Sequence, residues 1–261
     1  MDAAALKPTP KAYAELQQAY DFFNDELFAG ELPACLITFQ RERRSYGYFS
    51  KERFFDPTSG EVTDEIAMNC RYFATVPLIE ILQTLVHEMV HLWQFRCGTP
   101  SRKGYHNREF ADKMKEVGLM PSSTGQPGGK EVGQHMADYP LPGGPFIVAC
   151  EKLLQTAFRI TWMDRFPIHP EHVSTPEELA GDPSAEALVA LGAFDVPAES
   201  DSLDGESPAI AGEVSTNNSN RMKYTCPVCG DNIWGKWGKN RIQAGCFQTD
   251  ECKGARFEPQ Q

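Results

Sequence analysis

The chain has 261 residues, 41% of them hydrophobic, and a formal net charge of −11, which is enough for one or two domains with a hydrophobic core. It has no uninterrupted apolar run of about 20 residues and no secretory signal pattern at its start, so we expect a cytoplasmic protein, with association with the nucleoid left open. The acidic balance does not exclude a nucleic-acid partner, because residues 166–220 hold eleven acidic residues and no Lys or Arg.

The first part of the chain predicts a helix followed by short strands. Apolar residues recur at helical spacing from Pro10 to Phe28. Strand-like runs follow at Cys35–Gln40, Tyr46–Ser50 and Glu65–Asn69, and the turn-rich run Asp56–Glu61 before the last of them indicates a hairpin. We expect a small antiparallel sheet, whose edge would be suited to hold an extended peptide by strand addition.

Three arginines stand between the first two strand-like runs, at Arg41, Arg43 and Arg44. They are typical first of a solvated loop, and the alternative is contact with nucleic-acid phosphates. The sequence leaves both readings open.

A longer helix is predicted over Leu78–Phe95, with Thr75 as its N-cap. Its apolar residues lie on more than one face, which is typical of a buried helix. His87 and His91 are four residues apart and therefore leave the same side of the helix, next to Glu88. This H-E-x-x-H pattern supplies two zinc ligands and a general base. The alternative is a chance match in which the histidines are hydrogen-bonded in the core.

A catalytic zinc usually takes a third protein ligand. Two candidates follow the helix, His106 just before a predicted second helix over Asn107–Val117, and Glu109 within that helix. Spacing alone does not decide between them. The glycine-rich segment 121–146 is long enough to be a functional loop bordering a cleft, and a last helix over Phe146–Trp162 should close an α+β domain over 1–165.

The acidic segment 166–220 is rich in Pro, Ser and Gly, so we predict a mostly disordered linker. Within it, Ala185–Phe194 is apolar enough for a transient helix or for docking of a partner.

The remaining residues, 221–261, predict a small zinc ribbon. Four cysteines, Cys226, Cys229, Cys246 and Cys252, offer thiolates for a structural zinc, although the second pair has an unusually long spacing. Four unrelated thiols are the alternative. Aromatic and basic side chains in the same module suit single-stranded nucleic acid, or fill the module's core: Trp234, Lys236, Trp237, Lys239 and Arg241.

Three runs, DEIAMN (64–69), TLVHEMVHLWQ (84–94) and YHNREF (105–110), resemble the SprT-like (Spartan-type) family of zinc metallopeptidases over roughly residues 10–160. The resemblance implies a zincin-like fold, a catalytic zinc on His87, His91 and His106, and Glu88 as the base. It further implies that Glu109 orients a ligand, that a second zinc is structural, and that the substrates are DNA-associated or DNA-crosslinked proteins.

A different class of function is also compatible with these motifs. The chain would then be a DNA-binding or regulatory protein whose zinc core is structural or nearly inactive. Glu88 disfavours this reading, because a purely structural zinc site needs no base at that position.

Overall fold

The computed structural model of this chain describes residues 7–42, 45–102, 104–170, 183–196, 221–229, 232–236, 245–246, 255–256 and 258–259. The chain divides into two compact units, Met1–Asp201 and Ser202–Gln261. Their boundary lies inside the segment predicted as a linker. Each unit is described by itself.

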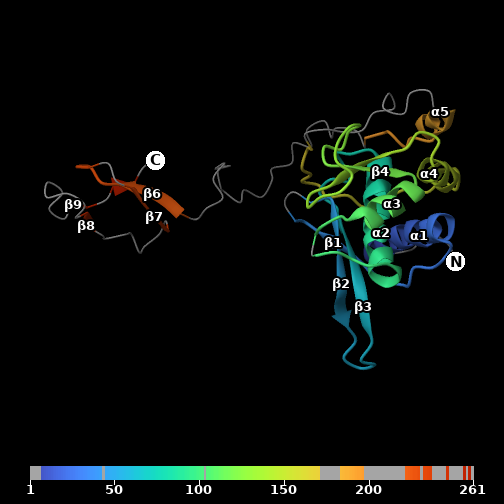
Figure 1. The fold of residues 1–261 in the computed structure, drawn as a ribbon, viewed down its shortest axis with the longest axis horizontal. Coiled ribbons are helices and arrows are strands. Elements are labelled where there is room, and N and C mark those ends of the chain that lie inside the picture. Colours follow the sequence, from blue (N-terminus) through green and yellow to red (C-terminus); the bar gives the residue numbers. More distant parts are fainter. Residues whose placement is uncertain are drawn as a thin grey trace. The chain divides into compact units, whose positions relative to one another are not determined.

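The first unit combines helices with small sheets, which confirms the predicted α+β class (Figure 1). Its elements in chain order are α1 (Pro8–Phe28), β1 (Leu36–Gln40), β2 (Gly47–Phe55), β3 (Val62–Asn69), α2 (Leu78–Cys97), α3 (Arg108–Glu116), β4 (Leu119–Ser122), β5 (Ala137–Pro140), α4 (Pro145–Gln155) and α5 (Pro183–Ala190).

The main sheet has the order β1-β3-β2, with β2 at one edge. β2 and β3 form the predicted antiparallel hairpin, but β1 pairs with β3 in parallel, so the expectation of a wholly antiparallel sheet is wrong. After the hairpin turn, β3 forms the central strand of the sheet, between β1 and β2. It is buried from Asp64 to Asn69. Alternation of apolar residues marks a strand but carries no information on its direction.

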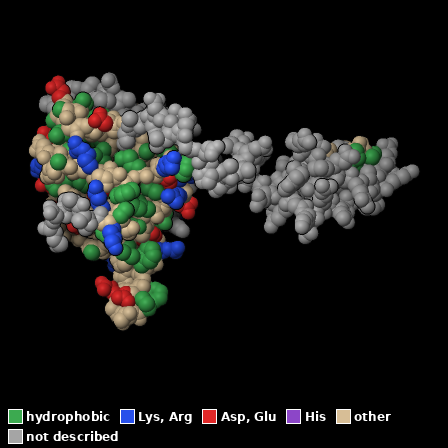
Figure 2. All heavy atoms as spheres, turned by 180° about the vertical axis from the view of Figure 1, so that it is seen from behind, with side chains coloured by type: hydrophobic (Ala, Val, Ile, Leu, Met, Phe, Trp, Pro, Cys, Tyr) green, Lys and Arg blue, Asp and Glu red, His purple; other side chains and the backbone are tan. Residues whose placement is uncertain are grey.

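The β2–β3 hairpin extends away from the rest of the unit (Figures 1 and 2). Hydrophobic and acidic side chains mix at its tip (Figure 2), where Phe54, Phe55 and Val62 are exposed. The turn closes through two backbone hydrogen bonds, from Asp56 N to Glu61 O and from Gly60 N to Asp56 O, both 2.8 Å.

The central helix of the unit is α2, which packs on β2 and β3 and also contacts α1, α3 and α4. Leu82, Leu85, Val86 and Met89 are at most 1% exposed, as expected for a helix with apolar residues on several faces. Its N-cap position is Pro77, not Thr75. The Thr75 hydroxyl instead donates to the carbonyl oxygens of Tyr72 and Ile168.

The end of the first unit differs from the prediction in two ways. α4 ends at Gln155, seven residues earlier than expected, and Phe158 and Ile160 reach the core from non-helical backbone. Residues 183–196 lie in the segment predicted as a mostly disordered linker with a transient helix at Ala185–Phe194, and they form α5 and a turn that pack on the first unit. The rest of the linker prediction, 171–182 and 197–220, lies outside the described residues.

The second unit contains short strands in two small sheets. They are β6 (Arg221–Thr225), β7 (Asn232–Lys236) and β10 (Glu258–Pro259) in the order β10-β6-β7, with β8 (Gly245–Cys246) paired to β9 (Ala255–Arg256). Among the residues that the structure describes, none of the helices has both the length and the apolar character to span a membrane.

Candidate metal centre

Three histidines converge at one point of the first unit. His87 and His91 project from α2, and His106 stands just before α3, where its backbone exchanges hydrogen bonds with Gly133 at 2.8 and 3.1 Å. One ring nitrogen from each histidine lies within 4.8 Å of the others, and His91 Nε2 is 3.1 Å from His106 Nε2. Residues distant in the sequence thus form one cluster that could hold a metal ion.

Hydrogen bonds fix the direction of two of the rings. His87 Nδ1 lies 2.7 Å from Asp138 Oδ2, and His106 Nδ1 lies 3.2 Å from the carbonyl oxygen of Gly133. In both rings this leaves Nε2 available to a ligand. Partners of this kind typically orient metal-binding histidines and set their tautomer.

The three imidazoles share one apolar neighbour, Phe110 of α3. Its ring centroid is 5.3, 4.3 and 4.7 Å from those of His87, His91 and His106, and the side chain is fully buried. The backbone N–H of Phe110 donates to the side chain of the helix N-cap, Asn107. This cap starts α3 directly after His106 and so holds Phe110 against the rings.

The cluster fits zinc. Two ligand nitrogens at about 2.0–2.1 Å from a tetrahedral zinc are about 3.3–3.4 Å apart, close to the 3.1 Å between His91 and His106. Without an ion, that approach of two buried ring nitrogens is stabilised only by a single hydrogen bond. Three imidazole nitrogens with room for a further ligand are also the donor set of catalytic zinc sites.

Burial and mutual repulsion keep two of the imidazoles neutral. Burial lowers the pKa of His91 well below its ordinary value, and the neighbouring His87 and His106 lower it further. The pKa of His106 falls to about 4, first through burial and then through His87. Burial also lowers the pKa of His87, but the hydrogen bond and charge of Asp138 prevail and raise it. Neutral imidazole is the form that binds a metal.

Glu88 lies beside the cluster on the same helix and is 7% exposed. Burial raises its pKa to about 7, although His87 opposes the shift. The side chain fits between α2 and β2 because Gly47 has no Cβ. A Cβ there would come within 2.9 Å of Thr84 Cγ2, 3.0 Å of the Ala67 carbonyl oxygen and 3.4 Å of Glu88 Cγ. A carboxylate of this pKa in a cleft is suited to proton transfer at neutral pH.

A cleft of about 980 Å³ opens over His87 and Glu88. The start of β2 and the exposed side of α2 form part of its lining. The glycine-rich segment contributes residues 124–127 and 136–140 together with Pro142, so the expectation that this segment borders a cleft is confirmed.

Glu109 takes a different place from the one that the resemblance implied. Its Oε2 accepts hydrogen bonds from Gln94 Nε2 at 2.9 Å and from the backbone N–H of Thr99 at 2.7 Å. Glu109 therefore joins the end of α2 to the start of α3. The groups that hydrogen-bond to the histidines are Asp138 and Gly133.

Asp138 is the site residue that the sequence reasoning missed. It lies on β5, 51 residues after His87, and its side chain is 7% exposed. Its Oδ1 is buried and has no hydrogen-bond partner among the described residues. The one sequence signal that pointed to Asp138 was its position in the glycine-rich segment that was expected to border the cleft.

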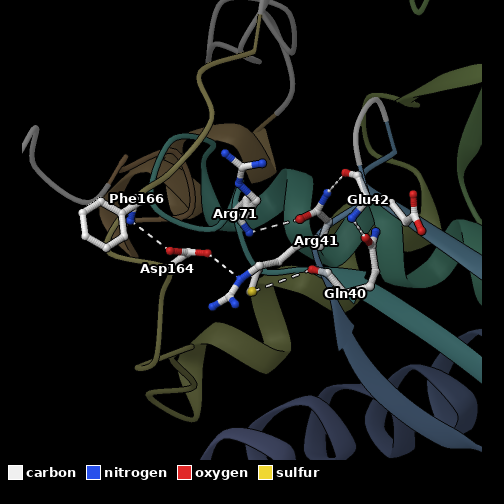
Figure 3. Close-up of polar contacts among 8 residues, drawn as sticks. Gln40, Arg41, Glu42, Arg71, Asp164 and Phe166 are labelled. Atoms are coloured by element: carbon white, nitrogen blue, oxygen red, sulfur yellow. Dashed lines mark hydrogen bonds and ion pairs between the residues drawn. The ribbon is translucent and has the colours of Figure 1, made fainter. Parts of the chain in front are cut away.

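The arginine-rich loop is described only in part. Arg41 is 71% exposed and pairs with Asp164 at 2.8 Å, and Asp164 also accepts from the backbone N–H of Phe166 (Figure 3). Arg41 thus joins this loop to the segment after α4. Arg43 and Arg44 lie outside the described residues.

The predicted zinc ribbon is also described only in part. Cys226 is buried and Cys229 is half-buried in the turn after β6. Cys246 lies on β8 with only its backbone described, and Cys252 lies outside the described residues.

The same limit applies to the predicted nucleic-acid contacts: Trp234 and Lys236 lie on β7 with only their backbone described, and Trp237, Lys239 and Arg241 lie outside the described residues.

Two comparisons with known proteins found similar sequences. Residues 16–128, which include all three histidines and Glu88 but not Asp138, match the model of the SprT-like family. A stretch of 59 residues is 63% identical to an uncharacterized protein in the mucB 3′ region of Salmonella typhimurium, covering 23% of this chain and 80% of that protein. A comparison with solved structures found no match.

Proposed function

Because this chain belongs to the SprT-like family, we propose that it is a zinc-dependent metallopeptidase. The observation that carries the proposal is the convergence of His87, His91 and His106, with His87 and the buried carboxylate of Glu88 lining a cleft. A structural zinc site would be satisfied by closed coordination and would not need either the carboxylate or the cleft.

The three histidines would hold the zinc through their free ring nitrogens, and Asp138 and Gly133 would keep two of the rings in position. A zinc ion bound there would polarise the scissile carbonyl and lower the pKa of a water molecule. Glu88 would accept the proton of that water and donate it to the leaving amine.

The edge of the main sheet offers a way to hold the substrate. β2 is an edge strand, and its first residue, Gly47, lies against Glu88. An extended peptide added to this edge would pass over the carboxylate, with its backbone hydrogen-bonded to β2. This mode binds any extended backbone and leaves side-chain preference to the rest of the cleft.

For the substrates we propose proteins that are associated with DNA or crosslinked to it, as the family resemblance implies. The second unit would supply the targeting, with a structural zinc on its four cysteines and with single-stranded DNA bound by its aromatic and basic residues. The protein would then act in the cytoplasm, at the nucleoid.

The test is the variant Glu88→Gln, assayed on a DNA-binding protein with and without single-stranded DNA. Removal of a general base costs roughly 10²–10⁴-fold in turnover, while the zinc content measured by mass spectrometry should stay at the wild-type value. The exposed Glu31→Gln is the matched control and should cleave normally. Retained cleavage by Glu88→Gln would contradict the assignment. DNA binding with no cleavage by the wild type would favour a DNA-binding protein with an inactive zinc core.

A further inference from the structure

The glycine-rich segment 121–146 supplies both groups that orient the histidine rings. The Gly133 carbonyl oxygen lies 3.2 Å from His106 Nδ1, and Asp138 Oδ2 lies 2.7 Å from His87 Nδ1. The direction of two of the three proposed ligands therefore depends on how this segment is held against α2 and α3. Different contacts hold Gly133 and Asp138.

The part of the segment around Gly133 is fastened to the start of α3. Gly133 and His106 exchange two backbone hydrogen bonds, at 2.8 and 3.1 Å. Two residues before Gly133, Glu131 Oε2 pairs with Arg108 Nη1 at 2.6 Å and with Lys115 Nζ at 2.7 Å, both on α3. Backbone pairing and two ion pairs thus keep Gly133 next to His106.

Asp138 is held by a contact to α2. It lies on β5, whose strand partner among the described residues is β4 alone, and a sheet of two strands is only marginally stable by itself. The amide of Gln83 donates from Nε2 to the Asp138 carbonyl oxygen at 2.9 Å. Because a carbonyl oxygen only accepts, this bond fixes which end of the amide faces β5. Gln83 therefore joins the backbone of β5 to α2.

Gln83 and His87 bind two different groups of the same residue. They stand four residues apart on α2, so both side chains leave the same side of the helix, and both line the cleft. Gln83 binds the backbone carbonyl oxygen of Asp138, and His87 binds its carboxylate. A backbone fixed at this point keeps the carboxylate within reach of Nδ1, and the ring of His87 then presents Nε2 to the proposed ion.

The contact between Gln83 and Asp138 has a cost in stability. Gln83 Oε1 and Asp138 Oδ1 are both buried, and neither has a hydrogen-bond partner within the described part of the chain. A buried acceptor without a partner destabilises a fold, and an apolar side chain of similar size at position 83 would avoid that loss. Stability alone therefore does not favour a glutamine there, and departures of this kind are typical of functional sites.

We propose that Gln83 is a positioning residue of the metal centre. Its amide holds the Asp138 backbone, the Asp138 carboxylate holds Nδ1 of His87, and His87 thereby directs Nε2 at the ion. Gln83 lies in the stretch that matches the SprT-like family, whereas Asp138 lies outside it. This inference rests on the zinc site of the proposed function and on no step of peptide cleavage.

Gln83→Met in the full chain tests the proposal, because it keeps the length of the side chain and removes both the donor and the unpartnered oxygen. Competition with a fluorescent zinc chelator measures the affinity, and the zinc that His106→Ala lacks is counted as that of the histidine site. We expect the affinity to fall roughly tenfold, the lower end of the loss typical of an outer hydrogen-bond partner. The thermal midpoint of the zinc-free chain should stay unchanged, because removal of the buried oxygen offsets the lost hydrogen bond.

Two further variants sharpen this test. Gln83→Glu keeps the size of the side chain and replaces the donating nitrogen by an acceptor, so the loss of zinc affinity should be at least as large. Gln155→Met is the matched control. Gln155 is an exposed helix glutamine whose amide donates to Glu151 of the same helix, so its replacement should leave the affinity unchanged.

A double-mutant cycle with Asp138→Ala shows whether Gln83 acts through Asp138. Asp138→Ala removes the carboxylate and keeps the backbone carbonyl group that Gln83 binds. If Gln83 acts by placing that carboxylate, Gln83→Met should change the zinc affinity of the Asp138→Ala protein by less than about twofold.

Two outcomes would overturn the role of Gln83. One is an unchanged zinc affinity in Gln83→Met, with or without a lower thermal midpoint, and the other is a loss of affinity that is equally large in the Asp138→Ala protein. The proposed function fails separately. If the wild type binds zinc at the histidines and cleaves no protein, the peptidase proposal is wrong and the role of Gln83 stands. If the wild type holds no more zinc than His106→Ala, both proposals are wrong.

Discussion

The two ends of the cleft are built in different ways. At the histidine end, His87 and Glu88 line the cleft from α2, and His91 of α2 and His106, just before α3, complete the histidine cluster. All four residues lie inside the stretch that matches the SprT-like family. At the other end, the start of α2 is covered by residues 169–170 and by Phe194, which lie outside that stretch. The histidines and Glu88 thus lie in the part that matches the family, whereas the other end of the cleft combines residues of that part with residues 169–170 and with Phe194 of the strap, residues 183–196, from outside it.

This difference separates the expected effects of substitutions. Changes at the histidine end should alter metal binding and turnover, because the proposed function makes the side chains there ligands, a base or their hydrogen-bond partners. Changes at the strap end should alter stability and KM, because that end packs on the helix and lines the cleft. A variant that broke this division would show that the two ends act as one site.

The largest effect is expected for His106→Ala at the histidine end. It leaves only two imidazoles, so zinc affinity should fall by well over the roughly 100-fold that is typical for loss of an outer hydrogen-bond partner. Metal content after dialysis against a weak chelator measures this directly. His135→Ala, an exposed histidine of the neighbouring loop, should keep its zinc. If Glu109→Ala released the metal and His106→Ala did not, the ligand set would be wrong.

Asp138→Asn should have the next largest effect. The amide keeps the shape of the side chain but removes the charge that pairs with His87 over 2.7 Å. Loss of such a partner typically lowers metal affinity by about 10–100-fold. Competition with a fluorescent zinc chelator measures the affinity, and the exposed Asp112→Asn serves as the control. Unchanged affinity would mean that Asp138 does not act on the metal through His87.

Asp138 also shows where prediction from the sequence stops. The i, i+4 spacing of His87 and His91 is a local property of a helix, so α2 and its polar side could be predicted from the residues alone. His106 needed the family resemblance, because the spacing left Glu109 open. Asp138 reaches His87 only through the folding of a loop 51 residues later, and no local pattern encodes that approach.

The predictions for the sheet and for residues 183–196 differ from the structure for related reasons. The apolar alternation of β1 identifies a strand, but its parallel pairing with β3 is decided by the hairpin that places β3 at the centre. The acidic composition of 166–220 pointed to disorder, and the apolar run Ala185–Phe194 was expected to form only a transient helix or to dock a partner, whereas Leu188 and Phe194 dock on the core of the same chain. Burial of a few side chains decides docking, and composition does not report it.

Leu188→Ala tests the strap end. Leu188 is fully buried, and truncation of a buried leucine typically costs about 2–5 kcal/mol. If the strap unfolds together with the first unit, the midpoint of denaturant unfolding should fall accordingly, with zinc affinity of the folded protein unchanged. The adjacent exposed Val189→Ala should have little effect. An unchanged midpoint would mean that the strap detaches independently, and KM should then still rise.

The smallest expected change in stability lies between the two ends, at Gly47. A Cβ there would meet Thr84 Cγ2 at 2.9 Å and the Ala67 carbonyl oxygen at 3.0 Å, so Gly47→Ala should cost about 1–3 kcal/mol through overpacking. It should also move β2 away from Glu88 and thereby lower turnover. A change confined to the strap is expected to alter stability and KM instead. Gly47→Ala combined with Thr84→Ser removes the first of the two close contacts and should recover part of both losses, because the backbone contact with Ala67 remains. Loss of stability with unaltered turnover would show that the edge of β2 does not set the position of the base, and the substrate would then have to be held by the glycine-rich segment on the other side of the cleft.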